Sequence, residues 1–179
     1  MNYSEFVSRK LGIVESAGID DPMLDYGMFP HQVDLAKWAL RRGRAAIFAD
    51  TGLGKSRMQL AWADTVRRVT GRDVLILAPL AVAQQTVEEG AKIGVSVTHA
   101  RESSDVHPGV NITNYDRVHK FDPSRFGAVV LDESSIIKHH AAKTLQTLLE
   151  MFRYTPFKLA CTRSEEHTSE IQSRQYLVC

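Results

Sequence analysis

The segment of residues 49–56 has the residue types of a loop that binds phosphate. Gly52 and Gly54 let the backbone turn so that its N–H groups face one concavity, which binds anionic oxygens. Lys55 is expected to reach the β- and γ-phosphates of a nucleotide, and the Ser56 hydroxyl to ligate Mg²⁺. The alternative is a glycine-rich turn with a chance lysine, which the strand before the loop and the helix after it disfavour. The predicted nucleotide-binding residues of the loop are Asp50, Thr51, Gly52, Leu53, Gly54, Lys55 and Ser56.

Two adjacent carboxylates, Asp132 and Glu133, follow the apolar run of residues 128–131. Neighbouring side chains on a strand point to opposite faces, so the two acids can take different roles. We expect Asp132 to hold Mg²⁺ and Glu133, as the general base, to orient and deprotonate an attacking water. Lys55 and Glu133 are therefore the predicted catalytic residues, and Ser56 and Asp132 the predicted metal ligands. A solvated acidic strand end is the alternative, which the phosphate loop in the same chain makes less attractive.

Alternating apolar strands and amphipathic helices surround these groups, and this alternation predicts an α/β fold with a parallel sheet and helices on both faces. The run of residues 74–77 is continuously apolar, as in strands buried on both faces. Trp38 and Trp62 lie on apolar helix faces and are expected in the core. Sites in such sheets lie at the carboxyl ends of the strands, where the phosphate loop and the acidic pair both fall. The predicted strands are residues 45–48, 74–77, 95–98, 110–113, 128–131 and 157–160, and the predicted helices are residues 32–42, 58–69, 81–91 and 142–152.

Composition excludes several classes of protein. With 179 residues, of which 44% are hydrophobic and 24% charged, the chain is long enough for one globular domain, and it is not collagen-like, disordered or a disulfide scaffold. The longest apolar run, residues 74–83, is about half a membrane span, and no secretory segment opens the chain. Only Cys161 and Cys179 are present, so a cytoplasmic location is expected. The net charge of +1 excludes a dedicated basic arm but leaves room for local phosphate contacts.

On these motifs, the chain resembles the first motor domain of superfamily-2 helicases and translocases, closest to the Swi/Snf-like and phage-type DEAD/DEAH branch. The phosphate loop is similar to motif I of that family, in which an alanine such as Ala49 is usual at the first position. Residues 132–138 are similar to motif II, although Ser134 and Ser135 depart from the usual alanine-histidine. The resemblance implies a three-layer, RecA-like P-loop NTPase fold that is incomplete at its C-terminus, with ATP and Mg²⁺ as cofactors.

Residues 29–32 resemble the adenine-reading segment that precedes motif I in this family, with Gln32 as the matching amide. A glutamine offers both a donor and an acceptor, which the edge of an adenine needs. An ordinary exposed glutamine near the start of a helix is the alternative.

Two further segments resemble the motifs with which this family contacts the backbone of nucleic acid. Residues 78–85 resemble motif Ia, and residues 112–115 resemble the next motif on the DNA side. Backbone N–H groups and hydroxyls can make such contacts without a high net charge. Taken alone, either segment could be a plain loop between a strand and a helix. The contacts with nucleic acid, expected to be DNA, that the resemblance implies come from Pro79, Gln84, Thr113 and Asn114.

The expected organisation has three parts. Residues 1–28 form an N-terminal extension, and residues 29–162 form the ATP-binding domain, which ends where the family has its motif III. Residues 163–179 resemble the in-frame translation of a common sequencing-library adapter, so we expect this tail to be non-native. The second RecA-like domain, which carries the arginines that complete the ATP site in this family, is not expected within the chain.

These features predict the ATP-binding motor domain of a DNA helicase or translocase, an ATP hydrolase without a membrane-spanning segment. One alternative is another P-loop enzyme, such as a small-molecule kinase, which needs neither Gln32 nor the paired acids and would consume a phosphoryl acceptor. The other alternative is a non-catalytic nucleotide-binding module.

We expect the chain to bind ATP with Mg²⁺ weakly and to hydrolyse it very slowly. The reason is that an arginine supplied from across a cleft is worth on the order of 10³ to 10⁵ in rate in P-loop enzymes. Phosphate release measured with and without DNA tests this expectation. Vigorous DNA-stimulated turnover by residues 1–162 alone would contradict it.

Overall fold

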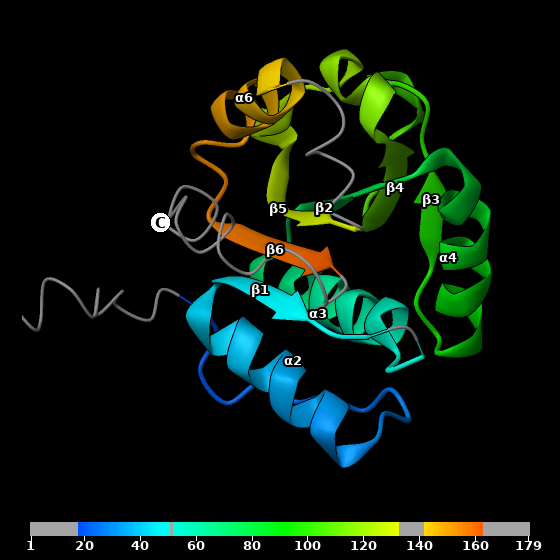
Figure 1. The fold of residues 1–179 in the computed structure, drawn as a ribbon, viewed down its shortest axis with the longest axis vertical. Helices are drawn as coiled ribbons and strands as arrows, with labels where there is room; N and C mark the ends of the chain where they lie inside the picture. Colours follow the sequence, from blue (N-terminus) through cyan, green and yellow to red (C-terminus); the bar gives the residue numbers. More distant parts are fainter. Residues whose placement is uncertain (1–17, 51, 133–141, 163–179) are drawn as a thin grey trace, which may run out of the picture.

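Six parallel strands form one sheet, in the order β1-β6-β5-β2-β4-β3 (Figure 1). This computed structural model describes residues 18–50, 52–132 and 142–162. The strands are β1 (Arg44–Phe48), β2 (Asp73–Ala78), β3 (Val97–His99), β4 (Val110–Asn114), β5 (Phe126–Leu131) and β6 (Phe157–Thr162). Strands β1 and β5 lead to the predicted site. They are joined by β6, the last strand of the described chain, which lies between them and pairs with both.

Helices cover both faces of the sheet (Figure 1). The α-helices are α2 (Pro30–Arg42), α3 (Lys55–Thr70), α4 (Leu80–Lys92) and α6 (Ala142–Met151), and the 3₁₀ turns are η1 (Ser103–Asp105), η2 (Tyr115–Lys120) and η3 (Pro123–Arg125). A proline is well suited to the first position of α2 because its missing N–H would be unpaired there anyway. Gly71 ends α3 in the left-handed conformation, with φ of 69°, a conformation that favours glycine.

Alternate residues of the central strand β2 pack into two separate cores. Val74 and Ile76 point to the face that α2, α3 and α4 cover, whereas Leu75 and Leu77 point to the face covered by α6 and η2. All four side chains are fully buried. Apolar surface is therefore removed from water on both sides of the strand, which explains why its sequence shows no polar alternation.

Every strand and helix predicted from the sequence is present, and the α/β fold with a parallel sheet and helices on both faces is confirmed. The third strand begins two residues later than predicted because Gly94, with φ of 75°, turns the chain and the N–H of Val95 bonds the carbonyl of Gly90 at 2.9 Å. The expectation for Trp38 is wrong: this side chain is 44% exposed, because α2 buries Ala36, Ala39 and Leu40 instead.

Residues before α2 also pack on the domain. The N–H of Ile19 donates to the carbonyl of Leu40 at 2.9 Å. The hydroxyl of Tyr26 donates to Asp64 at 2.8 Å, and the guanidinium of Arg68 both bonds that hydroxyl and lies over the ring. Burial raises the pKa of Tyr26, so the phenol stays a neutral donor. The segment that leads into α2 is thus fixed to α3.

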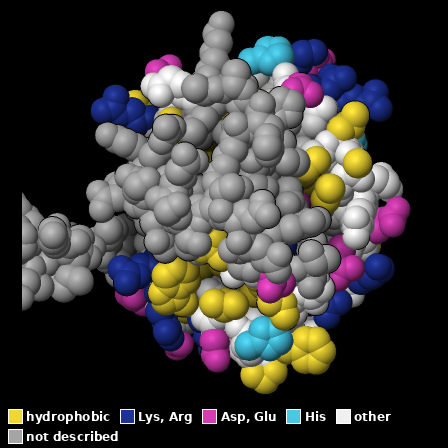
Figure 2. All heavy atoms as spheres, viewed as in Figure 1, with side chains coloured by type: hydrophobic (Ala, Val, Ile, Leu, Met, Phe, Trp, Pro, Cys, Tyr) yellow, Lys and Arg dark blue, Asp and Glu magenta, His cyan; other side chains and the backbone are white. Residues whose placement is uncertain are grey.

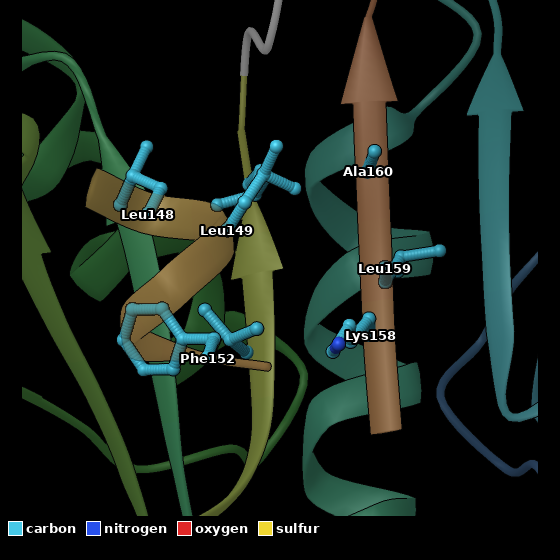
Figure 3. Close-up of a pocket in the computed structure, with 8 residues that line it drawn as sticks. Leu148, Leu149, Phe152, Lys158, Leu159 and Ala160 are labelled. Carbon is cyan, nitrogen blue, oxygen red and sulfur yellow. The ribbon is translucent and has the colours of Figure 1, made fainter. Parts of the chain in front are cut away.

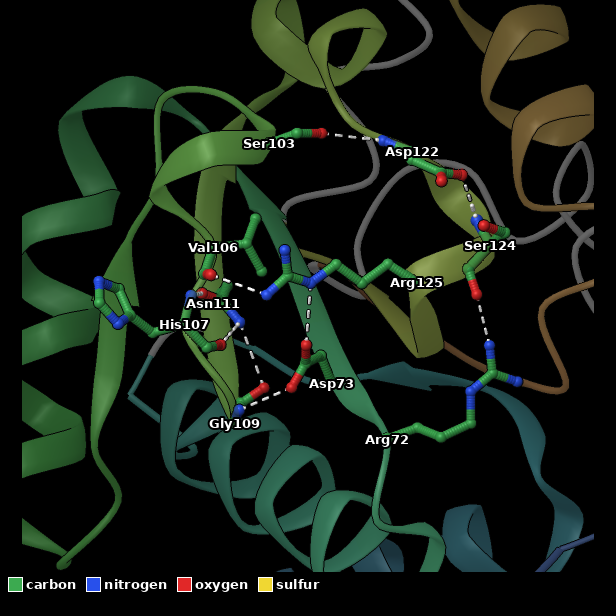
Figure 4. Close-up of polar contacts among 10 residues, drawn as sticks. All are labelled: Arg72, Asp73, Ser103, Val106, His107, Gly109, Asn111, Asp122, Ser124 and Arg125. Carbon is green, nitrogen blue, oxygen red and sulfur yellow. Dashed lines mark hydrogen bonds and ion pairs between the residues drawn. The ribbon is translucent and has the colours of Figure 1, made fainter.

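A polar network ties together the loops at the amino ends of the strands (Figure 4). The carboxylate of Asp73 accepts from Arg125 at 3.1 Å and from the N–H of Gly109 at 2.8 Å. Arg125 also donates to the carbonyl of Val106 at 2.8 Å, and Arg72 donates to that of Ser124 at 2.6 Å. This edge is opposite to the edge of the predicted site, so these interactions stabilise the fold and lie away from the site.

Around the rim of the face seen in Figure 2, dark blue basic side chains lie beside magenta acidic ones. No helix within the described ranges combines the length and the apolar character that a membrane crossing requires.

Replacing Trp62 by alanine is expected to lower the free energy of unfolding by about 3–5 kcal/mol, because the fully buried indole packs edge-to-face against Phe157 and its removal leaves a cavity. The matched variant Trp38→Ala is expected to cost less than about 1 kcal/mol. Urea unfolding followed by circular dichroism measures both values. Equal losses in the two variants would contradict this assignment of the core.

Candidate nucleotide-binding site

The carboxyl ends of three neighbouring strands bring the phosphate loop and Asp132 to one edge of the sheet. The N–H of Ala49, directly after β1, donates to the carbonyl of Thr162 at the end of β6, at 3.1 Å. On the other side of β6, Leu131 pairs with Ala160, and Asp132 follows directly. The phosphate loop and Asp132 therefore flank the end of β6, as expected for a site at the carboxyl edge of a parallel sheet.

The phosphate loop is a tight turn that runs directly into α3. Gly52 and Gly54 have φ of 89° and 76°, which side chains other than glycine rarely adopt. The ammonium of Lys55 donates to the carbonyl of Ala49 at 2.6 Å and so spans the base of the loop. The carbonyl of Gly54 accepts from the N–H groups of Arg57 and Met58, so α3 begins at Lys55 and its first N–H groups lie at the loop. Such a helix start favours negative charge.

Gln32 joins α2 to the phosphate loop. Its Nε2 donates to the carbonyl of Leu53 at 3.0 Å, and its Oε1 accepts from the N–H of Phe29 at 3.0 Å. A Cβ on Gly54 would lie 2.2 Å from Nε2, so only glycine permits this contact. The side chain is 5% exposed, which does not fit the alternative of an ordinary exposed glutamine. Each polar atom still has a second hydrogen-bonding position, because an amide has two N–H groups and two lone pairs on oxygen.

A cavity of about 610 Å³ opens beside this loop. The structure places five of the predicted loop residues and Gln32 around it. It also adds Arg57 and Glu89, which the sequence interpretation missed, and Phe29 and Gln85, which belong to segments singled out there but were not named as site residues. Arg57 could have been found as the neighbour of Ser56, whereas the contribution of α4 depends on tertiary packing. The lining residues are Phe29, Gln32, Asp50, Gly52, Gly54, Lys55, Ser56, Arg57, Gln85 and Glu89.

Asp132 is 6% exposed, and both of its own backbone polar groups are hydrogen-bonded. Its N–H donates to the carbonyl of Leu77 at 2.8 Å, and its own carbonyl accepts from the hydroxyl of Tyr115 at 2.7 Å. Glu133 and Thr51 lie outside the described residues, so their predicted roles stay predictions.

Cys161 lies on β6, between the segment that ends in Asp132 and the phosphate loop that carries Lys55, and the charges of both residues act on its thiol. Burial raises the pKa of its thiol, the carboxylate of Asp132 raises it further, and the ammonium of Lys55 lowers it. The thiol is therefore a neutral group between the two predicted charged elements of the site.

Mg²⁺ fits the oxygen groups at this edge. The ion keeps several waters and is usually bound by one or two carboxylates together with substrate phosphates. Ser56 and Asp132 offer this small donor set, and the described ranges contain no cluster of three or more His, Cys, Asp or Glu that would suggest a separate all-protein metal site.

The four residues predicted to contact nucleic acid differ in how far their side chains are exposed to solvent. Pro79 directly precedes α4, and Gln84 is an exposed residue of that helix, where its amide donates to Glu88 at 3.2 Å. Thr113 is fully buried and Asn114 is 7% exposed, so neither side chain offers a surface contact in this conformation. The reason is their position at the end of β4, which has α3 and α4 on one side and η2 on the other.

A second, apolar cavity of about 30 Å³ lies between α6 and strands β5 and β6 (Figure 3). Leu148 and Leu149 of α6 and Phe152, the residue directly after that helix, face it, and Lys158 lies on the strand beside it. Burial, with a smaller effect of Arg44, lowers the pKa of the Lys158 amine. This cavity is too small for a nucleotide, and it belongs to the packing of α6.

Comparison with solved structures shows helicase-type and SWI2/SNF2-type ATPase folds. The SWI2/SNF2 ATPase core of Sulfolobus solfataricus in complex with dsDNA is 17% identical, with a TM-score of 0.68 over 89% of this chain and 36% of that one. The UvsW helicase of bacteriophage T4 is 14% identical, with a TM-score of 0.68 over 98% of this chain and 64% of that one. A second structure of the Sulfolobus core domain is 20% identical, with a TM-score of 0.64 over 79% of this chain and 32% of that one.

At these identities the likeness shows the fold, and it confirms the predicted RecA-like parallel sheet and, at the level of fold, the resemblance to Swi/Snf-like helicase domains. The chain spans about a third of the Sulfolobus cores and under two thirds of UvsW. No family model and no curated protein sequence matches the chain.

We expect the thiol of Cys161 to resist alkylation by iodoacetamide at pH 9 in the folded protein and to react quickly in urea, because only the thiolate reacts and the folded state keeps the proton. Since the unfolded state loses that proton, the free energy of unfolding falls as pH rises above about 8.5. Mass spectrometry of a Cys179→Ser variant follows this single thiol. Alkylation of folded protein at the unfolded rate would show that the thiol is not enclosed.

Proposed function

We propose that the chain is the ATP-binding motor domain of a superfamily-2 DNA helicase or translocase. The observation that carries this proposal is the cavity at the carboxyl edge of the sheet, which the phosphate loop and Gln32 line together on a helicase-type fold. Its volume of about 610 Å³ lies in the range of small-molecule and cofactor sites.

The phosphates are proposed to occupy the concavity of the loop. Gly52 and Gly54 present backbone N–H groups there, and the start of α3 adds its positive end. Lys55 is proposed to exchange its bond to the Ala49 carbonyl for the β- and γ-phosphates, with which its ammonium makes stronger, charge-assisted bonds.

The acidic residues are proposed to act at the γ-phosphate. Ser56 and Asp132 would hold Mg²⁺, which supplies positive charge against the β- and γ-phosphates when it is bound. Glu133 is proposed to orient the attacking water and accept its proton, since it directly follows Asp132. The buried position of Asp132 beside β6 supports its share of this assignment.

The base is proposed to lie at the Gln32 side of the cavity. Gln32 has one free N–H and one free lone pair beyond its bonds to Leu53 and Phe29, and these suit an adenine edge. Phe29 lines the same cavity and is 67% exposed, so its ring offers an apolar surface to a base.

Nucleic acid is proposed to contact the loop at Pro79 and the exposed face of α4 that carries Gln84. The Sulfolobus core, which has a similar fold, was solved in complex with dsDNA, and this supports nucleic acid as the partner. Thr113 and Asn114 are proposed to contribute through backbone groups of the same edge, because their side chains are buried.

Residues 29–162 are proposed as the ATP-binding unit, with residues 1–28 preceding it and residues 163–179 as a non-native tail. A second RecA-like domain is proposed to supply the arginines that complete the site and to close over bound ATP, which would shift the population of the two domains towards a closed state.

The variant Lys55→Ala is expected to abolish measurable ATP binding, because it removes the cation that meets the phosphates. Lys120→Ala is the matched control, since that exposed lysine does not line the cavity. Isothermal titration calorimetry with ATP and Mg²⁺ measures the dissociation constants, and circular dichroism checks the fold. Unchanged affinity in Lys55→Ala would refute the assignment of the site.

A further inference from the structure

Arg57, the residue directly after Ser56, bridges three segments around the cavity. One guanidinium nitrogen donates to the carbonyl of Gly27 at 3.0 Å, and the other donates to Glu89 at 3.1 Å. Gly27 belongs to the segment that leads into α2, Arg57 to the first turn of α3, and Glu89 to α4. One side chain therefore joins the wall segments that come from three different parts of the chain.

The contact with Gly27 fixes the segment on the base side of the cavity. Gly27 has φ of 59°, so the chain turns there between Tyr26, which is bonded to Asp64, and Phe29, whose N–H bonds Gln32. The bond from Arg57 holds the middle of this turn, next to Met28, which packs against the core. Phe29, which lines the cavity, follows this turn by two residues, and its N–H donates to Gln32.

The contact with Glu89 fixes α4 against α3. Glu89 lines the cavity, and its carboxylate also pairs with Lys92 at 3.3 Å. Although burial acts to raise the pKa of Glu89, the bonds from Arg57 and Lys92 lower it, so the carboxylate stays charged and paired. The ion pair between Arg57 and Glu89 is partly shielded, with exposed side-chain fractions of 32% and 23%, so it is more than a fully solvated surface contact.

Both terminal nitrogens of Arg57 are engaged by acceptors of the protein, whereas the ammonium of Lys55 lies at the phosphate loop itself. Arg57 and Lys55 are the two cations among the residues that line the cavity in the described part of the chain. The two cations therefore have different roles. Lys55 is placed to meet the phosphates of the proposed nucleotide, and Arg57 connects the segments that line the cavity.

We infer that Arg57 is a positioning residue that gives the cavity its selectivity for the base, acting through the Gly27 carbonyl and Glu89 on the segment that carries Phe29 and Gln32. This inference rests on the proposed nucleotide site. A guanidinium can donate to the Gly27 carbonyl and to Glu89 at the same time from two nitrogens at a fixed spacing, whereas a lysine has a single nitrogen. The positive charge of a lysine alone therefore cannot replace Arg57.

The test compares the dissociation constants of ATP, CTP and inorganic tripolyphosphate for the full chain, with Mg²⁺ present, by titration calorimetry. In Arg57→Gln, the preference for ATP over CTP is expected to fall roughly tenfold, since two hydrogen bonds of a charged group are lost. Tripolyphosphate affinity is expected to stay within about twofold, because the phosphate loop is untouched. Arg57→Lys is expected to lose most of the preference as well.

Two further variants keep the test independent of folding. Glu89→Ala removes the acceptor at the other end of the bridge and is expected to lower the same preference, with effects that do not add in the double variant. Arg101→Gln is the matched control, because Arg101 is exposed and lies outside the cavity.

The outcomes separate the inference from the proposed function. A wild-type chain that binds none of the three probes contradicts the proposed site itself. If ATP binds but Arg57→Gln keeps the wild-type preference, the positioning role is wrong and the site stands. A loss of tripolyphosphate affinity in Arg57→Gln would also overturn the inference, since it would show Arg57 to be a direct phosphate ligand.

Discussion

Strand β6 holds the candidate site together because it lies between β1 and β5, and both of those strands lead into predicted site residues. Its last residue, Thr162, bonds the start of the phosphate loop, and Ala160 pairs with the residue before Asp132. The residues of β6 lie more than one hundred residues after β1 in sequence. The chain must therefore close long loops before the site exists, a step that costs conformational entropy.

Local sequence was enough to predict the elements and the phosphate loop. A short apolar strand, the glycines of the loop and the helix after it are all encoded within residues 44–70, although this helix begins at Lys55, three residues before its predicted start. Arg57 was missed although it directly follows Ser56, whereas the contribution of Glu89 was not predictable because it depends on how α4 packs against α3. Trp38 was misjudged for a related reason: two alanines and a leucine give α2 its buried stripe, and a periodic pattern alone does not say which large residue lies outside it.

Helix α4 connects the two kinds of surface that the proposal requires. It begins next to Pro79, where contact with nucleic acid is proposed, and Gln85 and Glu89 of the same helix line the cavity in which nucleotide binding is proposed. The ion pair between Arg57 and Glu89 joins this helix to the turn that follows the phosphate loop. A displacement of α4 would therefore act on both surfaces through one rigid element, which is the kind of physical link that coupling between two sites needs.

The most direct test of the account is a titration of isotope-labelled protein with ATP and Mg²⁺, followed by the ¹⁵N–¹H correlation spectrum. The account predicts saturable shifts that are largest at the backbone amides of Gly52, Gly54, Lys55 and Ser56, and a clear shift at the side-chain amide of Gln32. The absence of saturable shifts, or shifts confined to α6 and the apolar cavity beside it, would contradict the claim that this cavity binds a nucleotide.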